Sequence, residues 1–481
     1  MDHYDIILRN GTVIDGSGAP RVTEDVAIQG ACIAAMGDLG GARATLDMDV
    51  GGRVVAPGFI DAHTHDDRYL LSAPGMPAKL SQGVTTVITG NCGLSLAPWI
   101  PARSQPVPPP LDLLGGPDDF VYSDFHGYLA ALEATPAALN AACLVGHSTL
   151  RAATLDTLAR AATDREIGLM QDGVRQALAS GAIGFSTGLN YPPAVCAGRD
   201  ELQALVQPLR ELGGIYASHI RDEGEHVIPA LDEACAVGAA GCAPLVVSHH
   251  KLSGRRNHGR SVETLRYLAQ AARRQLVALD CYPYNAGSSM LRMSNVQRAS
   301  RVLITRSAPH PEFAGQDLDR IAQQLGVSIE QAVDALQPAG AIYFMMDERD
   351  VQRILAFPHT MIGSDGLPHD VAPHPRLWGA FPRVLGHYCR ELGLFSLETA
   401  VYKMTGLTAQ TFGLPGRGLL APGMHADITV FDPDHVADRA DWLAPTRPSA
   451  GIDLVIVNGI LAWRDGGATG ARAGRVIRRA E

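Results

Sequence analysis

Six side chains that can bind a metal or move a proton follow directly behind short apolar runs of the sequence. They are His63, His65, Cys92, His219, His249 and Asp365. Imidazole and thiolate are ligands that zinc prefers, and a catalytic zinc site needs about three protein ligands and one open position. A carboxylate beside such a site can accept a proton and later return it. The pattern therefore predicts a catalytic zinc site.

The pair His63 and His65 lies one residue apart, behind the run VVAPGFI. On a strand, residues i and i+2 point to the same face, so we expect both imidazoles to face the same end of the fold. A single buried histidine or cysteine is more often a core residue than a ligand. Five such residues gathered at strand ends favour a metal site over coincidence.

Three further histidines, and the alternative reading of Asp365, are weighed against this pattern. In the doublet His249–His250 only one side chain can face inward, and we expect His249 to do so and His250 to be structural. For His147, a supporting role beside the site and a core role stay open. His226 is expected in the loop or helix that follows the fifth strand, as a structural residue. Asp365 alone would be read as the stabilising residue of a Ser-Asp-Gly turn.

Eight short apolar runs, each followed by a helix-like segment, must position these side chains. The runs are VVAPGFIDAHTH, GVTTVITGNCG, NAACLVGHS, GAIGFSTG, GIYASHI, APLVVSHH, LVALDCYPY and TMIGSDG. Segments such as 164–180 and 261–275 have helical spacing. The alternation predicts an α/β fold, a (β/α)8 TIM barrel, whose active site lies at the carboxyl ends of the strands. A long loop is expected at 101–117.

Both ends of the chain have a different pattern, of short strands and turns. Asn-Gly in 4–18 and in 453–466 predicts hairpins, and 25–38 looks like a further hairpin. We expect one small β-sandwich built from both termini, 1–57 and 414–481, around a hydrolase barrel at 58–413. The stretch 285–346, with its own helix-like segment DLDRIAQQLG, is expected to be an insertion between the seventh and eighth strands.

Composition narrows the class of protein. The 481 residues have a formal net charge of −10, which argues against nucleic acid and anionic membranes as main partners. The eight cysteines form no CxxC pair, no signal peptide is visible, and no apolar stretch approaches the roughly 18 residues of a membrane span. These observations predict a cytoplasmic protein without disulfides.

The ordered motifs resemble the amidohydrolase superfamily, in which HxH, two later histidines and an aspartate surround one or two metals. Many members bridge two metals with a lysine of the fourth strand. This chain has only three lysines, Lys79, Lys251 and Lys403, and none lies in GAIGFSTGLNYPP. With Cys92 as the alternative bridging ligand, GFIDAHTHDD, QGVTTVITGNCGLSLAP, YASHIRDEGEH, VVSHHK and HPRLWGAFPRVLGHY resemble the N-acyl-D-amino-acid deacylases, over essentially the whole chain.

The resemblance implies hydrolysis of a linear amide in an N-acyl-D-amino acid. It implies a tight zinc site at Cys92, His219 and His249, and a second, weaker position at His63 and His65 that shares Cys92. Asp365 would be the catalytic acid and base. The D configuration follows from the resemblance alone. The chain's partner would be a small molecule, and no nucleic acid or membrane is expected.

The substrate's α-carboxylate needs donors, for which the resemblance indicates Lys251 and Arg376, with Tyr191 and Tyr282 near strand ends. Asn190 and the segment 288–301, with Asn295, Gln297, Arg298 and Arg301, would suit a polar side chain. A guanidinium binds a carboxylate through two hydrogen bonds, so N-acyl-D-glutamate is expected first and N-acyl-D-aspartate second. Arg298 is the candidate contact; a solvated arginine is the alternative.

Other functions stay open at this point. The chain could act on neutral N-acyl-D-amino acids, or it could be a cyclic amidohydrolase, although those enzymes typically use the missing lysine. A deaminase would have no natural role for Cys92. A barrel without catalysis, acting as a scaffold, would be expected to have lost some ligand positions, whereas all are present.

Overall fold

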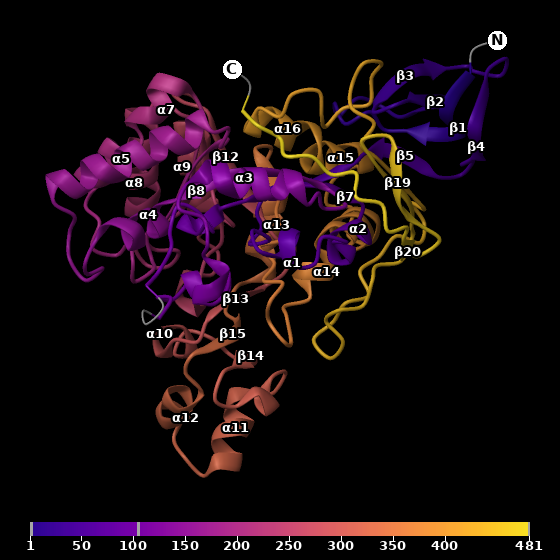
Figure 1. Ribbon diagram of the computed structural model, residues 1–481. Helices are drawn as coiled ribbons and strands as arrows, with labels where there is room; N and C mark the ends of the chain where they lie inside the picture. The colour runs from indigo at the N-terminus through magenta and orange to yellow at the C-terminus, as the bar shows by residue number, and fades with distance from the viewer. Residues whose placement is uncertain (1–2, 103–105, 480–481) are drawn as a thin grey trace.

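The computed structural model of the chain describes residues 3–102 and 106–479 (Figure 1). Its strands there form three sheets of eight, nine and three strands. The eight-stranded sheet is parallel between neighbours and lies at the centre of the chain sequence, whereas the nine-stranded sheet combines both ends. The predicted α/β class is confirmed.

The central sheet is a nearly closed barrel, and its eight strands are the eight predicted runs. In chain order they are β6 (Phe59–Asp61), β7 (Val84–Thr89), β8 (Asn140–Gly146), β9 (Gly184–Gly188), β10 (Ile215–His219), β11 (Leu245–Val247), β12 (Val277–Cys281) and β16 (Thr360–Ile362). At the carboxyl ends of β6 and β16, the N–H of Ala62 donates to the carbonyl of Ile362, and Thr64 pairs with Gly366. These contacts bring the first and last strands together.

Helices connect the barrel strands on the outside. They are α1 (Tyr69–Ser72), α2 (Pro77–Leu80), α3 (Phe125–Ala134), α4 (His147–Thr154), α5 (Asp164–Ala179), α6 (Arg199–Leu205), α7 (Gln207–Leu212), α8 (Val227–Ala240), α9 (Ser261–Ala271), α13 (Glu348–Ala356), α14 (Arg376–Arg383) with its π-helical continuation η6 (Val384–Glu391), α15 (Leu397–Met404) and α16 (Gly406–Phe412). The predicted helices at 164–180 and 261–275 are α5 and α9. Alternate strand residues such as Ile60, Leu144 and Val246 fill the barrel, and their neighbours pack against the helices.

Strands from both termini share the nine-stranded sheet, which appears in indigo and yellow beside the barrel in Figure 1. They are β1 (His3–Val13), β2 (Val22–Gln29), β3 (Cys32–Gly37), β4 (Arg43–Asp49), β5 (Val54–Pro57), β17 (Ile428–Phe431), β18 (Ile452–Val457), β19 (Ile460–Arg464) and β20 (Gly467–Ala468). The sheet has its own core, which includes Leu8, Val26 and Ile428. The expected joining of the two termini is confirmed, and the domain limits at 57 and 413 stay predictions.

Two of the three predicted hairpins form, and one is wrong. β2 pairs with β3 and β18 pairs with β19, both antiparallel. At Asn10–Gly11, however, β1 continues through a bulge and pairs with β2 on both sides of it. Asn10 adopts a φ of 59°, and its N–H and side-chain amide donate to Asp25 and Asp49. A residue with left-handed backbone can form a β-bulge, which adds one residue to a strand, as readily as a hairpin turn.

The sequence predicts one strand in the apolar run 54–60, but the structure divides this run between two sheets. Val54–Pro57 belongs to the terminal sheet and Phe59–Asp61 to the barrel. Gly58 lies between them, and a Cβ there would be 2.2 Å from the side chain of Thr85. The close approach explains why a residue without a side chain marks the crossing.

The expected insertion lies between β12 and β16. It contains the sheet of β13 (Ala286–Met290), β14 (Val302–Ser307) and β15 (Ala339–Phe344), with α10 (Met293–Val296), α11 (Leu318–Leu325) and α12 (Ile329–Leu336). It projects from the barrel at the bottom of Figure 1. The expected loop at 101–117 carries a short 3-10 turn, Leu111–Leu113, and its residues 103–105 are outside the described residues.

In the described residues, no helix combines the length and the apolar character that crossing a membrane requires.

Candidate metal centre

Three of the predicted site residues adopt a left-handed backbone just after a barrel strand. Cys92, His249 and Asp365 have φ values of 56°, 35° and 48°. They are three of only eight non-glycine residues with positive φ in the described chain. Such conformations are uncommon and persist where the surrounding structure requires them, often at functional sites. Local turns, and not strand alternation alone, therefore direct these side chains.

The two histidines of the HxH motif also reach the site through a bend. β6 ends at Asp61, and the chain bends at Ala62 and His63. Ile60 and Ala62 pack inside the barrel, so a straight strand would have placed His63 on the opposite face. The predicted common direction of His63 and His65 holds, because their nitrogens and the Cys92 sulfur lie within 4.8 Å of one another.

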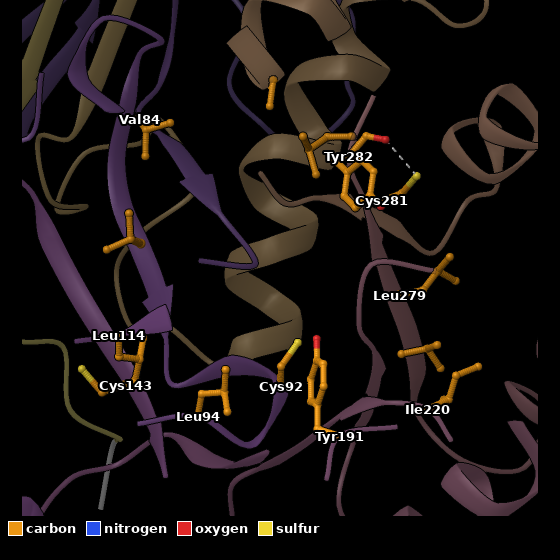
Figure 2. Packing of buried hydrophobic residues seen from close by; sticks show 14 of the residues in the cluster. Val84, Cys92, Leu94, Leu114, Cys143, Tyr191, Ile220, Leu279, Cys281 and Tyr282 are labelled. Carbon is orange, nitrogen blue, oxygen red and sulfur yellow. Dashed lines mark hydrogen bonds between the residues drawn. The ribbon is translucent and has the colours of Figure 1, made fainter. Parts of the chain in front are cut away.

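The sulfur of Cys92 is surrounded by imidazole nitrogens from three strand ends. Sγ lies 3.3 Å from Nε2 of His63, 3.6 Å from Nδ1 of His219 and 3.3 Å from Nε2 of His249. A tetrahedral zinc ion separates a sulfur and a nitrogen ligand by about 3.5 Å. The observed spacing therefore fits zinc. Figure 2 shows Cys92 beside Leu94 and Tyr191, which belong to the same cluster of buried hydrophobic residues.

Charges within this cluster favour the ligand form of the thiol. Burial by itself raises the pKa of the Cys92 thiol, but the nearby imidazoles of His63 and His249 lower it well below its usual range. A thiolate is the form that binds a metal. Burial lowers the pKa of His65, but Asp365 and Cys92 raise it to about 9. The thiolate and carboxylate charges thus favour the protonated form of the His65 imidazole, which burial alone would disfavour.

Asp365 is buried between the imidazoles and an arginine. Its Oδ1 lies 3.3 Å from Nε2 of His65 and 3.6 Å from Nε2 of His63, and its Oδ2 lies 2.9 Å from Nη1 of Arg376. Burial raises the pKa of Asp365, but the Arg376 guanidinium and the imidazoles lower it well below its usual range. The side chain is therefore ionised in this arrangement.

Two carboxylates that sequence reasoning missed orient the imidazoles. Oδ2 of Asp280 lies 3.3 Å from Nδ1 of His63, and its Oδ1 accepts the N–H of His249 at 2.9 Å. Oε1 of Glu223 lies 3.1 Å from Nδ1 of His249. Such outer carboxylates determine which imidazole nitrogen faces a metal. An acidic residue inside the apolar run LVALDC, and one four residues after His219, were the available indications.

A pocket opens beside this cluster, between the barrel strand ends and the insertion. Its lining includes Asn190, Tyr191, Glu223, Lys251, Tyr282, Ser288, Arg292, Asn295, Arg298 and Asp365. The ring of Tyr191 lies 4.7 Å from that of His219. Nζ of Lys251 lies 5.7 Å from the ring centre of Tyr282, and the Arg376 guanidinium lies 4.4 Å from the same ring. The four predicted carboxylate-binding residues thus gather at the cluster.

The structure pairs both predicted cations with carboxylates of the protein. Nζ of Lys251 donates to Oε1 of Glu223 at 2.6 Å, and Arg376 pairs with Asp365. Arg376 is completely buried, at the start of α14. A substrate carboxylate at Lys251 would therefore share that ammonium with Glu223.

Only some of the residues predicted to bind the substrate's side chain line the pocket. Arg298 is exposed and lines the pocket with Asn295, whereas Arg301 is paired with Asp317 and stacked on Phe344. Arg292, which sequence reasoning missed, also lines the pocket. Its guanidinium lies over the ring of Tyr191, donates to the carbonyl of Asn190, and has a buried Nη2 without a hydrogen-bond partner.

The remaining histidines lie apart from the sulfur. Nε2 of His250 lies 2.9 Å from Oγ1 of Thr264. Nε2 of His147 lies 2.9 Å from Oε1 of Glu201. His226 is exposed, immediately before α8. The geometry thus matches the expected separation of His249 from His250, and it turns His147 away from the cluster.

Sequence comparison finds full-length relatives. The amidohydrolase family model matches residues 48–254 and 330–461. A D-aminoacylase of Alcaligenes xylosoxydans xylosoxydans is 58% identical over 476 residues, 99% of this chain and 98% of that protein. An N-acyl-D-aspartate deacylase of the same organism is 51% identical, covering 98% and 95% of the two chains. Its N-acyl-D-glutamate deacylase is 47% identical, covering 100% and 97%.

Solved structures agree with these relatives. A D-aminoacylase with a binuclear metal centre, in which one metal activates and the second attenuates, has a TM-score of 0.96 and 57% identity, covering 99% of this chain and all of that one. The N-acyl-D-glutamate deacylase of Bordetella bronchiseptica, with zinc and a phosphonate that mimics the tetrahedral intermediate, has a TM-score of 0.95 and 45% identity at the same coverage. The chain therefore belongs to the amidohydrolase family, in its branch of D-aminoacylases and N-acyl-D-amino-acid deacylases.

Proposed function

We propose that this chain is a zinc-dependent hydrolase that cleaves the amide bond of N-acyl-D-amino acids and releases a carboxylate and a D-amino acid. The observation that carries the proposal is the Cys92 sulfur, with imidazole nitrogens of His63, His219 and His249 at 3.3 to 3.6 Å and the carboxylate of Asp365 beside them. The names and structures of the full-length relatives support the same reaction.

The donor set suits one tight zinc ion and one weaker position. Cys92, His219 and His249 would hold the tight ion, and His63 and His65 would form the second position with Cys92. A bound zinc ion supplies a Lewis acid, which activates water and polarises the amide carbonyl. Asp280 and Glu223 would keep the imidazoles of His63 and His249 in the tautomers that this arrangement needs.

Asp365 would move the proton. Its ionised carboxylate accepts a proton from the attacking water and then donates that proton to the departing amide nitrogen. The ion pair with Arg376 and the contact with His65 direct its two oxygens, so the carboxylate needs no rearrangement before it acts. The carboxylate is largely buried and lines the pocket, where it can reach the water and the amide.

The pocket would bind the substrate through its charged ends. Lys251 and Tyr282 would bind the α-carboxylate, with Tyr191 closing the opposite wall and Arg376 acting from behind the ring of Tyr282. Arg292, Asn295 and Arg298 supply cationic and amide donors on the insertion side. These groups support an acidic substrate, N-acyl-D-glutamate first and N-acyl-D-aspartate second.

A neutral substrate is the second candidate. The 58% identity to D-aminoacylase exceeds the identity to the aspartate and glutamate deacylases. Tyr343 and Met345 also line the pocket and would suit an apolar side chain. The test is a panel of N-acetyl amino acids as D and L pairs, with glutamate, aspartate, methionine and leucine, assayed with zinc-loaded protein. A cyclic amide such as a hydantoin completes the panel. Hydrolysis of the L forms, or of the cyclic amide alone, would contradict the proposal.

The acidic preference has its own test. Arg298→Leu and Arg292→Leu should each lower kcat/KM on N-acetyl-D-glutamate about tenfold, as expected for one charge-assisted hydrogen bond, with a smaller change on N-acetyl-D-methionine. Arg301→Leu is the matched control, because Arg301 is paired with Asp317. An equal loss on both substrates would remove the specificity argument.

The setting of the enzyme is part of the proposal. All eight cysteines are free and the net charge is −10, which supports a reducing, cytoplasmic location and a small-molecule substrate rather than nucleic acid or membrane.

A further inference from the structure

Lys79 is a completely buried lysine on α2 that the proposed function does not use. All three lysines of the chain are buried, which is unusual for a residue that is almost always at the surface. Nζ of Lys79 donates to Oδ2 of Asp61 at 2.7 Å and to Oγ of Ser364 at 2.8 Å, and it lies 3.3 Å from Oδ2 of Asp66. One ammonium thus connects the end of β6 with the end of β16.

The same groups hold the backbone around Asp365. Oδ1 of Asp61 accepts the N–H of Ser364 at 2.7 Å and that of His63 at 3.3 Å. Oγ of Ser364 accepts the N–H of Gly366 at 3.2 Å. The N–H of Asp365 itself donates to the carbonyl of His63 at 2.8 Å. Both neighbours of Asp365 are therefore fixed by groups outside the pocket.

Asp365 needs such support because its φ of 48° lies in the left-handed region. A side-chain-bearing residue keeps this conformation only where the surroundings over-determine it. The conformation is useful, since it places Oδ1 near His65 and Oδ2 near Arg376. If the backbone relaxed to an ordinary φ, the carboxylate would leave both partners.

The Lys79 ammonium remains charged, and it can therefore keep its hydrogen bonds. Burial by itself lowers the pKa of its ammonium, but the carboxylates of Asp61 and Asp66 outweigh burial and raise that pKa. The group therefore stays charged and keeps its three protons for donation. All of Lys79, Asp61, Asp66 and Ser364 are 0% exposed, so water does not compete for these bonds.

We propose that Lys79, Asp61 and Ser364 form a clamp that positions the proton-transferring Asp365 by holding the ends of β6 and β16 in register. The clamp residues touch neither substrate nor the candidate ligand atoms, so they act through Asp365 as positioning residues. The expected effect of the clamp on kcat rests on the proposed function. The claim that the clamp holds the backbone around Asp365 concerns the fold alone.

The decisive variant is Ser364→Ala, which removes one hydroxyl and leaves the buried charges paired. Its matched control is Ser248→Ala, because Ser248 is equally buried, directly precedes His249, and has an Oγ without a hydrogen-bond partner in the described residues. With zinc-loaded protein and N-acetyl-D-amino acids, Ser364→Ala should lower kcat at least about tenfold and change KM less than about twofold. Ser248→Ala should leave both constants near those of the parent.

Two readouts do not depend on activity. Zinc bound per chain should be the same in both variants, because no candidate ligand is changed. Amide hydrogen exchange in the peptide covering 363–367 should be faster in Ser364→Ala and unchanged in Ser248→Ala, because the N–H of Gly366 loses its acceptor.

Lys79→Met tests the ammonium itself, with Lys403→Met as its control. Lys403 is also buried, and its Nζ donates to the carbonyls of Phe357 and Thr360 at the opposite end of β16. Both variants remove a buried lysine at one end of the same strand. Lys79→Met should lower kcat in the folded fraction and speed exchange at 363–367, whereas Lys403→Met should affect unfolding alone.

The outcomes separate the two proposals. An inactive parent protein would end the proposed function, and the exchange measurement would still decide the clamp. An active parent whose Ser364→Ala variant keeps its kcat, or whose exchange at 363–367 matches that of Ser248→Ala, would overturn the clamp. Equal losses of kcat in Lys79→Met and Lys403→Met would show a general effect of lost stability instead.

Discussion

Two buried polar clusters lie at the carboxyl ends of the barrel strands, and they differ in how their atoms are satisfied. In the first, around Cys92, sulfur and imidazole nitrogens face one another at 3.3 to 3.6 Å. In the second, Arg151 and His147 both bind Glu201. The remaining nitrogens of Arg151 donate to two backbone carbonyls, those of Pro193 and Arg160.

The difference distinguishes a reactive centre from a structural one. The Arg151–Glu201 pair joins cation to anion and donor to acceptor, and none of its residues has a positive φ. In the Cys92 cluster, metal-binding atoms of several side chains lie within 4.8 Å of one another, on a backbone that is left-handed at three places. Convergent ligand atoms need a cation from outside, whereas matched charges do not. Histidine at a strand end is common to both, so residue type alone could not separate His147 from His219.

Removal of the sulfur should have the largest effect. Cys92→Ala should lose stoichiometric zinc and lower kcat by about 1,000-fold or more, because the tight ion loses its thiolate ligand. Metal analysis and steady-state kinetics measure both. Cys143→Ala is the control, since Cys143 is a buried cysteine on β8 whose thiol pKa burial raises to about 12. Zinc and activity retained in Cys92→Ala would overturn the ligand assignment.

Breaking the second cluster should act on stability instead. Arg151→Met leaves the Glu201 carboxylate buried without its guanidinium, and it should lower the free energy of unfolding by about 3 to 5 kcal/mol. Urea unfolding of the metal-free protein measures the change, and zinc per chain in the folded protein should not fall. A variant as stable as the parent, or one that has lost zinc, would contradict the structural role assigned to the second cluster.

A change at the edge of the first cluster should be milder. His65→Asn removes an imidazole 3.3 Å from Asp365 but none of the three tight-site ligands. It should keep one firmly bound zinc and lower kcat about tenfold, as for one lost hydrogen bond to a charge. Zinc titration followed by metal analysis should show the loss of any second, weaker binding event. Loss of the first zinc ion would mean that His65 belongs to the tight site.

The pH dependence of the second cluster should be the smallest effect. Burial raises the pKa of Glu201, but His147 and Arg151 lower it to about 2. Because the folded pKa lies below the unfolded value of about 4.3, this carboxylate stabilises the fold above that value and loses the effect as pH falls. The stability difference between parent and Glu201→Gln, metal-free, should therefore shrink between about pH 5 and pH 3. A constant difference would contradict the ion pair.

Much of the barrel was predictable, because the spacing of apolar residues and the turn residues between segments are local features of the sequence. The eight apolar runs became the eight strands, and the segments behind them became helices such as α5 and α9. The hairpin at Asn10–Gly11 failed, because a left-handed residue serves a bulge as well as a turn. The run 54–60 was divided at Gly58, since which sheet accepts each half depends on distant partners.

The candidate site was predictable in its residue types and less so in its geometry. Cysteine, histidine and aspartate behind strands indicated the chemistry, because ligand softness belongs to the side chain itself. Glu223, Asp280 and Arg292 were missed, since their roles depend on the atoms they face rather than on neighbours in the chain.

The amino-acid sequence by itself determined the order of strands, the donor atoms available at their ends, and the lack of a lysine in the fourth strand. Only the tertiary structure decided which donors converge, because that depends on the left-handed turns at Cys92, His249 and Asp365 and on the ties between β6 and β16. Backbone strain of this kind is stable only when contacts distant in sequence hold it, and such contacts exist only in the folded chain.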